Sequence, residues 1–285
     1  MKFLASAGCI AGVLLVSSSL CPAVAQDFSA AAPKPPFPVI FVSGKGVDNA
    51  GCGTQVKPCR TFKFAVTQTS ANGEIKALDP ADYGPVTITK SISLTGFDGA
   101  GIDSTPAGGT AITINANASD TINIRNLILD GAKIAGTGII LNSGGALSIV
   151  HCTVRNFTVN GGILLAPIGT TSTVLISDVF ISNDGHFGIG GVGPASVTVR
   201  RAYVTGNATG ILHAFNNFTL ADSLVTNNSG DGISVTRGGF LLVHSIITRN
   251  NTGIVIGMPA DSDGNNFIDG NTTNLIGTLN KVGTQ

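Results

Sequence analysis

The chain contains no tryptophan, two tyrosines and a single glutamate, Glu74, and only 11% of its 285 residues are charged. Basic and acidic side chains number 16 each, so no excess charge predicts a nucleic acid or an anionic membrane as a partner. With 43% hydrophobic residues, the low charge excludes a disordered chain. Valine, isoleucine and threonine recur where helix formers are scarce, which predicts an all-β protein.

Residues 1–25 are typical of a cleaved secretory signal peptide. Lys2 precedes an apolar stretch, and Ala23-Val24-Ala25 provides the small-x-small pattern of a cleavage site. A lipoprotein signal at Cys21 is disfavoured because Leu20 stands where a small residue is expected. Cleavage near Ala25 predicts a secreted or periplasmic protein, and the remaining chain has no apolar run long enough to span a bilayer.

Residues 26–38 are rich in proline and predict an extended linker. Behind it, Cys52 and Cys59 predict a disulfide across a short loop, because export leads to an oxidising compartment. Cys152 lies among apolar residues and predicts an inert core thiol. The expected domain covers 39–285, with an N-terminal cap at 39–85, coils at 86–264 and a C-terminal cap at 265–285.

A repeat begins at about residue 121. Gly-Ile pairs recur every 21 to 26 residues, at Gly138-Ile139, Gly162-Ile163, Gly188-Ile189, Gly210-Ile211, Gly232-Ile233 and Gly253-Ile254. This period is typical of one coil of a three-sided β-solenoid, since a coil cannot bury its apolar face without neighbours. Roughly eight coils about 4.8 Å apart are expected. A short amphipathic helix at Thr61–Thr69 is expected to cover the first coil.

Between the Gly-Ile pairs, short runs begin and end with aliphatic residues and predict strands with one face inward. The runs are Ile124–Leu129, Ile149–Val154, Ile176–Ile181, Val199–Val204, Leu220–Val225 and Leu242–Ile247. An asparagine follows most of them. These asparagines predict a structural ladder between coils, formed by Asn156, Asn183, Asn207, Asn228 and Asn250.

The chain resembles the pectin-lyase-like superfamily of right-handed parallel β-helix proteins, and within it secreted bacterial β-helix repeat proteins. The resemblance rests on Phe41-Val42-Ser43-Gly44, on the stretch from Cys52 to Phe62, on Tyr83 to Ile92 and on Asn266 to Asn271. It implies the fold for nearly the whole mature chain. Members of the superfamily include lyases, hydrolases, esterases and adhesins, so it implies no single activity.

The catalytic motifs of two enzyme branches are missing from the sequence. Polygalacturonase-like members would show Asn-Thr-Asp, Asp-Asp, Gly-His-Gly and Arg-Ile-Lys, and none of these occurs. Pectate-lyase-like members would show an Arg-x-Pro motif, and no arginine here is followed by proline two residues later. These absences argue against either activity but leave a lyase or hydrolase with other motifs open.

Alignment of the aliphatic runs places one polar residue of each coil in a column: Asn126, His151, Asp178, Arg201, Asp222 and His244. We expect Arg201 to pair with Asp178 or Asp222 in neighbouring coils. Two residues later an outward column follows, consisting of Ile128, Thr153, Phe180, Tyr203, Leu224 and Ile246. In one interpretation, the polar column is a solvated turn with weak ion pairs, and the outward column is an apolar strip covered by another part of the chain or by another subunit. In the other, the two columns together border a groove for an extended polar ligand.

The groove hypothesis assigns ligand binding to His151, Asp178, Phe180, Arg201, Tyr203, Asp222 and His244, with Phe180 and Tyr203 as a platform for sugar rings. Asp178 and Asp222 are weak candidates for a catalytic pair. Two coils apart, at about 9.6 Å, they would stand at the outer edge of the inverting-glycosidase range. Arg201 between them would lower the pKa of both, which is wrong for a general acid.

No cofactor is predicted. Asp261-Ser262-Asp263-Gly264-Asn265 resembles part of a calcium loop but lacks the later bidentate acid, so a polar turn is favoured. Asp98 and Asp103 are expected in turns, and His213 is expected to be buried in an apolar column.

The preferred hypothesis is a non-catalytic secreted solenoid that contacts polysaccharide or the cell envelope through one face. A polysaccharide lyase or glycoside hydrolase, and a structural or adhesive surface rod, are the alternatives. The sequence leaves the oligomeric state open.

Overall fold

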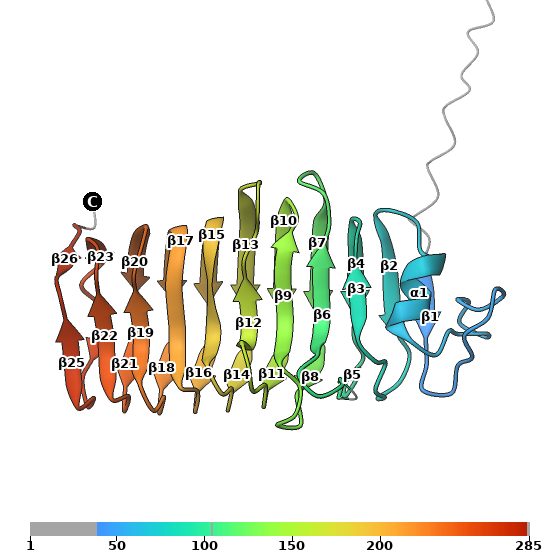
Figure 1. Ribbon diagram of the computed structural model, residues 1–285, viewed down its shortest axis with the longest axis horizontal. Helices are drawn as coiled ribbons and strands as arrows, with labels where there is room; N and C mark the ends of the chain where they lie inside the picture. Colours follow the sequence, from blue (N-terminus) through green and yellow to red (C-terminus); the bar gives the residue numbers. More distant parts are fainter. Residues whose placement is uncertain (1–38, 104, 284–285) are drawn as a thin grey trace, which may run out of the picture. The chain divides into compact units, whose positions relative to one another are not determined.

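A computed structural model describes residues 39–103 and 105–283 of the chain. The predicted signal peptide and linker, residues 1–38, lie outside the described residues. From residue 39 onward the chain winds into stacked coils whose strands pair only in parallel, which makes an all-β parallel β-solenoid (Figure 1). Within the described residues, no helix is both long and apolar enough to cross a membrane.

Each regular coil contributes one strand to each of three faces, which we call A, B and C. Face A contains β3 (Val86–Ile88), β6 (Thr110–Asn115), β9 (Thr137–Ser143), β12 (Gly161–Leu165), the first part of β15 (Phe187–Arg200) and of β17 (Thr209–Ala221), β19 (Asp231–Val235), β22 (Thr252–Ile256) and β25 (Thr273–Ile276). The stack has about nine coils rather than eight, because β25 lies in the predicted C-terminal cap and pairs with β22 as a regular coil strand.

Face B contains β1 (Val39–Val42), β2 (Gly73–Ala77), β4 (Ile92–Thr95), β7 (Thr121–Arg125), β10 (Ala146–Val150), β13 (Ser172–Ser177), the later parts of β15 and β17, β20 (Gly239–Val243), β23 (Ala260–Ser262) and β26 (Leu279–Lys281). Face C is narrower, with β5 (Gly101–Ile102), β8 (Ile128–Asp130), β11 (Thr153–Arg155), β14 (Phe180–Ser182), β16 (Tyr203–Thr205), β18 (Leu224–Thr226), β21 (Ile246–Thr248) and β24 (Phe267–Ile268).

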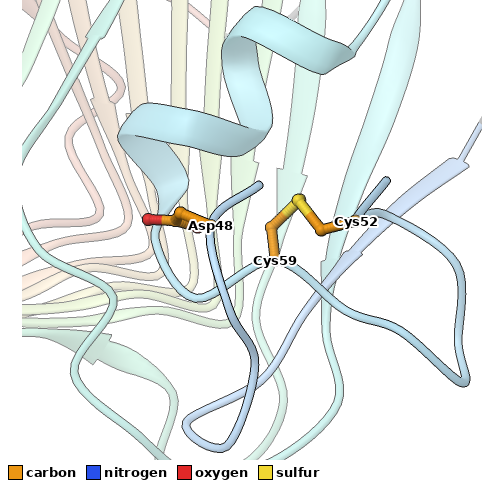
Figure 2. A group of neighbouring side chains, drawn as sticks. All are labelled: Asp48, Cys52 and Cys59. Carbon is orange, nitrogen blue, oxygen red and sulfur yellow. A yellow bond between two sulfur atoms is a disulfide. The ribbon is translucent and has the colours of Figure 1, made fainter. Parts of the chain in front are cut away.

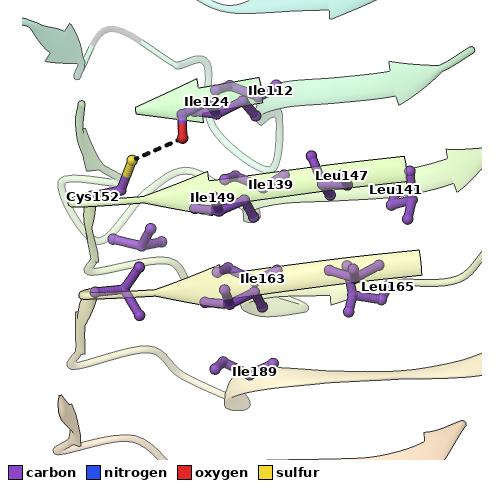
Figure 3. Close-up of a cluster of buried hydrophobic side chains, with 14 of the residues drawn as sticks. Ile112, Ile124, Ile139, Leu141, Leu147, Ile149, Cys152, Ile163, Leu165 and Ile189 are labelled. Carbon is purple, nitrogen blue, oxygen red and sulfur yellow. Dashed lines mark hydrogen bonds between the residues drawn. The ribbon is translucent and has the colours of Figure 1, made fainter. Parts of the chain in front are cut away.

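The core consists of aliphatic columns that run from coil to coil. The isoleucines of the Gly-Ile pairs are fully buried, and Figure 3 shows Ile112, Ile139, Ile163 and Ile189 stacked in register. Each such burial stabilises the fold by roughly 1.5–3 kcal/mol. The preceding glycine is required by close approach: a Cβ at Gly138 would lie 2.4 Å from the Gly162 carbonyl oxygen of the next coil. Each Gly-Ile pair therefore marks a corner at which the backbones of neighbouring coils approach too closely for a side chain at the glycine position.

Helix α1 (Phe62–Gln68) covers the first coil, as the sequence predicted. Phe62, Ala65 and Val66 are buried, and the hydroxyl of Thr61 accepts a hydrogen bond from the Phe64 amide as N-cap. Cys52 and Cys59 form the predicted disulfide beside the helix (Figure 2). Cys152 is a buried free thiol whose pKa is raised to about 11 by burial, and it contacts the Ile124 carbonyl (Figure 3).

Two predictions about the strands were wrong in detail. The aliphatic runs such as Ile124–Leu129 are not single strands, because each contains a left-handed residue at which face B ends and face C begins. The asparagine ladder was also misplaced in two coils. Asn156 and Asn183 occupy left-handed positions with φ of 64° and 60°, and the ladder position belongs to the following residue.

The ladder itself lies inside the corner between faces C and A. The side-chain amide of Asn207 donates to Asn228 Oδ1 at 3.1 Å, Asn228 donates to Asn250 at 2.9 Å, and Asn250 donates to Asn271 at 3.0 Å. Each Oδ1 also accepts the backbone N–H of the preceding rung. The rungs therefore satisfy both backbone and side-chain donors in a buried corner. The rung before Asn207 is Asp184, a carboxylic residue.

Candidate functional site

The polar column predicted from the sequence is a column of left-handed turn residues between faces B and C. The φ angles are 57° for Asn126, 53° for His151, 57° for Asp178, 47° for Arg201, 48° for Asp222 and 43° for His244. Strand pairing of face C keeps them in register, since Thr153 pairs with Phe180 and Phe180 with Tyr203. We call these six residues the charged column.

The charged column combines residue types that tolerate the left-handed backbone with one, Arg201, that does not favour it. A left-handed residue other than glycine costs roughly 1–2 kcal/mol, less for asparagine or aspartate, whose short polar side chains can bond locally. Gly99, with φ of 78°, and Asn126 suit this conformation, and Arg201 suits it least. Backbone geometry alone therefore does not explain the arginine at position 201, whereas the aspartates at 178 and 222 are residue types that tolerate this conformation.

Arg201 is bound to Asp178 by two hydrogen bonds. Its Nε donates to Asp178 Oδ1 at 2.6 Å and its Nη2 donates to Oδ2 at 2.8 Å. His151 Nε2 lies 4.0 Å from the same carboxylate, and Ser177 also donates to it. Hydrogen bonds from Arg201 and Ser177 hold the pKa of Asp178 well below its usual range. Asp178 is consequently unsuited to act as a general acid.

Arg201 does not bind Asp222, contrary to one of the two predicted pairings. The hydrogen bond to Asp178 raises the pKa of Arg201, with a smaller effect of the Asp222 charge, but among the described residues no hydrogen bond or ion pair reaches the Asp222 carboxylate. Asp222 therefore presents an exposed carboxylate. A shallow surface pocket lies beside it, lined by Arg201, Tyr203, Asp222, Leu224, His244 and Ile246.

His244 closes the charged column near a second carboxylate. Its Nδ1 lies 3.4 Å from Asp263 Oδ2, and Asn265 lies 3.5 Å from its Nε2. The partial calcium loop at 261–265 uses this carboxylate for its own turn, because Asp263 Oδ1 accepts from the Asn265 amide and from the Asn266 side chain. The sequence favoured a polar turn over a calcium site here, and the absence of a cofactor stays a prediction.

The outward column of face C lies next to the charged column. Phe180 and Tyr203 are 37% and 39% exposed, and their rings meet edge to face with centroids 5.3 Å apart. Ile246 and Phe267 extend the exposed apolar column toward the last coil. The structure therefore brings all seven predicted ligand-binding residues to one edge and the face beside it, while their role stays a prediction.

Sequence reasoning missed a second group at the beginning of face C. Asp82, Asp103, Asp130 and Arg155 line a pocket of about 220 Å³. Burial and the neighbouring Asp82 carboxylate raise the pKa of Asp103, whereas Asp130 is bound by Arg155 at 2.7 Å. Asp103, Asp130 and Arg155 each follow a buried aliphatic residue at the end of face C strands. That shared register was the signal available in the sequence.

Two other chemical groups are accounted for by the fold. Asp48, Cys52 and Cys59 are close enough to share a metal ion, but the two sulfur atoms are bonded to each other (Figure 2). Asp48 instead accepts from the Arg60 amide and from the Thr61 hydroxyl below α1. His213 is fully buried in the column of Leu141, Leu165 and Val235, as predicted.

A family model for the right handed beta helix region matches residues 110–273. The chain belongs to this right-handed β-helix family. The match covers more than half of the sequence, and together with the coil stack it supports a pectin-lyase-like β-helix protein. No curated protein matches the sequence.

Solved structures share the β-helix fold at low identity. The ORF18 protein of Geobacillus virus E2 has a TM-score of 0.56 and 13% identity, over 70% of this chain and 48% of that one. The Dettilon tailspike protein has a TM-score of 0.56 and 14% identity, over 82% of this chain and 50% of the tailspike chain. Pectate lyase Pel9A has a TM-score of 0.54 and 12% identity, over 84% of this chain and 78% of the lyase chain. This chain thus spans about half of the ORF18 protein and of the tailspike protein, and these identities establish the fold alone.

Proposed function

We propose that this β-helix protein is secreted and binds a polysaccharide or cell-envelope glycan, without catalysis, along the edge between faces B and C. The observation that carries the proposal is the exposed Phe180–Tyr203 pair beside charged residues in left-handed positions. Aromatic faces flanked by hydrogen-bonding groups are suited to sugar rings, which have apolar faces and polar rims. An extended chain ligand also fits a surface whose residues repeat about every 4.8 Å.

Secretion is supported by the signal-like residues 1–25 and by the Cys52–Cys59 disulfide. The absence of catalysis is supported by Asp178, whose pKa is lowered by its bonds to Arg201, and by the missing enzyme motifs. The neighbour named pectate lyase and the tailspike protein indicate polysaccharides as the first ligands to test.

The test is binding of the mature protein to a panel of neutral and acidic polysaccharides. A Phe180→Ala, Tyr203→Ala double variant should weaken binding by about tenfold or more, which corresponds to about 1.4 kcal/mol. Ile168→Ala with Val192→Ala is the matched control, because both side chains are exposed and apolar but lie outside face C. Equal binding by the two double variants would contradict the proposal.

A polysaccharide lyase or hydrolase is the second candidate, favoured by Asp103 beside Asp82 in the pocket at the start of face C. A carboxyl group with a raised pKa beside another carboxylate is a usual property of general acids. Release of unsaturated products or new reducing ends, lost in Asp103→Asn, would establish this function. Turnover lost instead in Asp178→Ala would overturn the non-catalytic proposal at the charged column.

A further inference from the structure

Asp184 takes the place of an amide in the buried ladder. Its Oδ1 accepts the Phe157 backbone N–H at 2.9 Å, as each asparagine Oδ1 does for the rung before it. Its own backbone N–H donates to Asn207 Oδ1 at 2.9 Å. Asp184 is only 2% exposed, so its second carboxyl oxygen, Oδ2, has no access to bulk water.

The position of Oδ2 is that of the amide nitrogen in the other rungs. A Cβ built on the facing glycine would lie 2.9 Å from Nδ2 of Asn207, 2.8 Å from that of Asn228, 2.7 Å from those of Asn250 and Asn271, and 2.6 Å from Asp184 Oδ2. In the asparagine rungs this nitrogen donates to the next Oδ1. Asp184 Oδ2 has no hydrogen-bond partner. If Asp184 is ionised, both its Oδ2 and Asn207 Oδ1 are acceptors, and neither can donate to the other.

We propose that Asp184 is protonated in the folded protein and that its carboxylic O–H donates to Asn207 Oδ1, so that the ladder contains one proton-dependent rung. The proton supplies the donor that the geometry requires and removes a buried charge. Burial, with a smaller effect of Asp130, raises the pKa of Asp184 to about 8.

The opposite arrangement, an ionised Asp184 facing a rotated Asn207 amide, conflicts with the neighbouring bonds. Rotation would turn Asn207 Nδ2 toward the Asp184 backbone N–H, which now donates to Asn207 Oδ1. It would also remove the donor to Asn228 Oδ1. Among the described residues, the charge that acts on this rung is that of Asp130 at the end of β8, and its carboxylate is already bound by Arg155 and Asn156.

The direction of the pH effect follows from the raised pKa. The folded protein keeps the Asp184 proton up to a higher pH than the unfolded chain does, because the folded pKa is about 8 and the ordinary aspartate pKa is about 4. The proton therefore stabilises the fold fully below about pH 4, and this stability is lost as pH rises toward 8. One such proton changes the unfolding equilibrium tenfold per pH unit within that window.

The experiment compares wild type, Asp184→Asn and Asp261→Asn in urea unfolding at several pH values between 6.5 and 8. Wild type and the exposed control Asp261→Asn should lose stability with a slope of up to tenfold per pH unit relative to Asp184→Asn, which carries the amide at all pH values. Equal slopes in the three proteins would overturn the proposal.

A direct readout does not depend on comparing the stabilities of variants. In protein with carbon-13-labelled aspartate carboxyl groups, one resonance of the wild type should titrate near pH 8 and should be missing in a folded Asp184→Asn variant. If the resonance that Asp184→Asn removes titrates near or below pH 4 in the wild type, Asp184 is ionised at neutral pH and the proposal is wrong.

Discussion

Residues of the charged column must adopt a left-handed backbone conformation and at the same time present a polar side chain at the surface. Arg201 accepts an unfavourable backbone conformation and binds Asp178 through two hydrogen bonds. Asp222 has the same conformation without a hydrogen bond or ion pair among the described residues. The backbone cost at Asp222 is therefore not offset by a contact within the described fold, which is consistent with a role in binding.

Asp222 allows this cost to be measured. We expect Asp222→Asn to be more stable than Asp222→Ala by about 1 kcal/mol, because asparagine tolerates the left-handed region and alanine gains nothing there. Urea unfolding of the two variants gives the difference. Leu241→Ala and Leu241→Asn, in an ordinary strand of face B, serve as the comparison pair, and a similar preference for asparagine there would refute the explanation.

At the scale of the element, the ladder ties the C-to-A corner of one coil to the next. Asn228 lies at its centre, accepts from both the backbone and the side chain of Asn207, and donates to Asn250. The neighbouring Asn227 is exposed, with φ of 55°, and its column also contains Gly206 and Gly270. Adjacent asparagines thus have different structural roles.

Asn228→Ala should destabilise the fold by about 2–3 kcal/mol, because two buried donors of Asn207 lose their acceptor. Asn227→Gly should change stability by less than about 0.5 kcal/mol, because glycine suits the left-handed position. The free energy of unfolding of each variant is the measurement. Similar losses in both would show that the buried ladder is not what distinguishes these neighbours.

At the scale of the whole molecule, two buried titratable groups, Asp184 and His213, make the stability of the fold depend on pH in opposite directions. Burial lowers the pKa of His213 to about 4, and its ring accepts from the Phe215 N–H and contacts the Gly239 carbonyl at 3.1 Å. Since the unfolded chain binds this proton at higher pH, the stability linked to His213 is present above about 6.5 and is lost as pH falls toward 4. The proposed Asp184 proton acts in the opposite direction.

His213→Leu should remove this acid sensitivity, and leucine suits a column that contains Leu141 and Leu165. From pH 6.5 to about 4, wild type should lose up to tenfold per pH unit in its folding equilibrium relative to the variant. The variant should be less stable at neutral pH, because the Phe215 N–H loses its acceptor. Parallel pH profiles of urea unfolding would contradict a buried neutral His213.

The sequence by itself determined the coil stack, because the Gly-Ile period and the aliphatic runs record burial and close approach, which depend on residue size. It also predicted the capping helix and placed Phe180 beside Tyr203, since register follows from repeat spacing. Only the tertiary structure decided which residue of Asn183-Asp184 enters the corner, whether Arg201 binds Asp178 or Asp222, and that Asp103 lies near Asp82. These choices depend on backbone angles and side-chain reach between coils, which a pattern of residue types along one chain does not record.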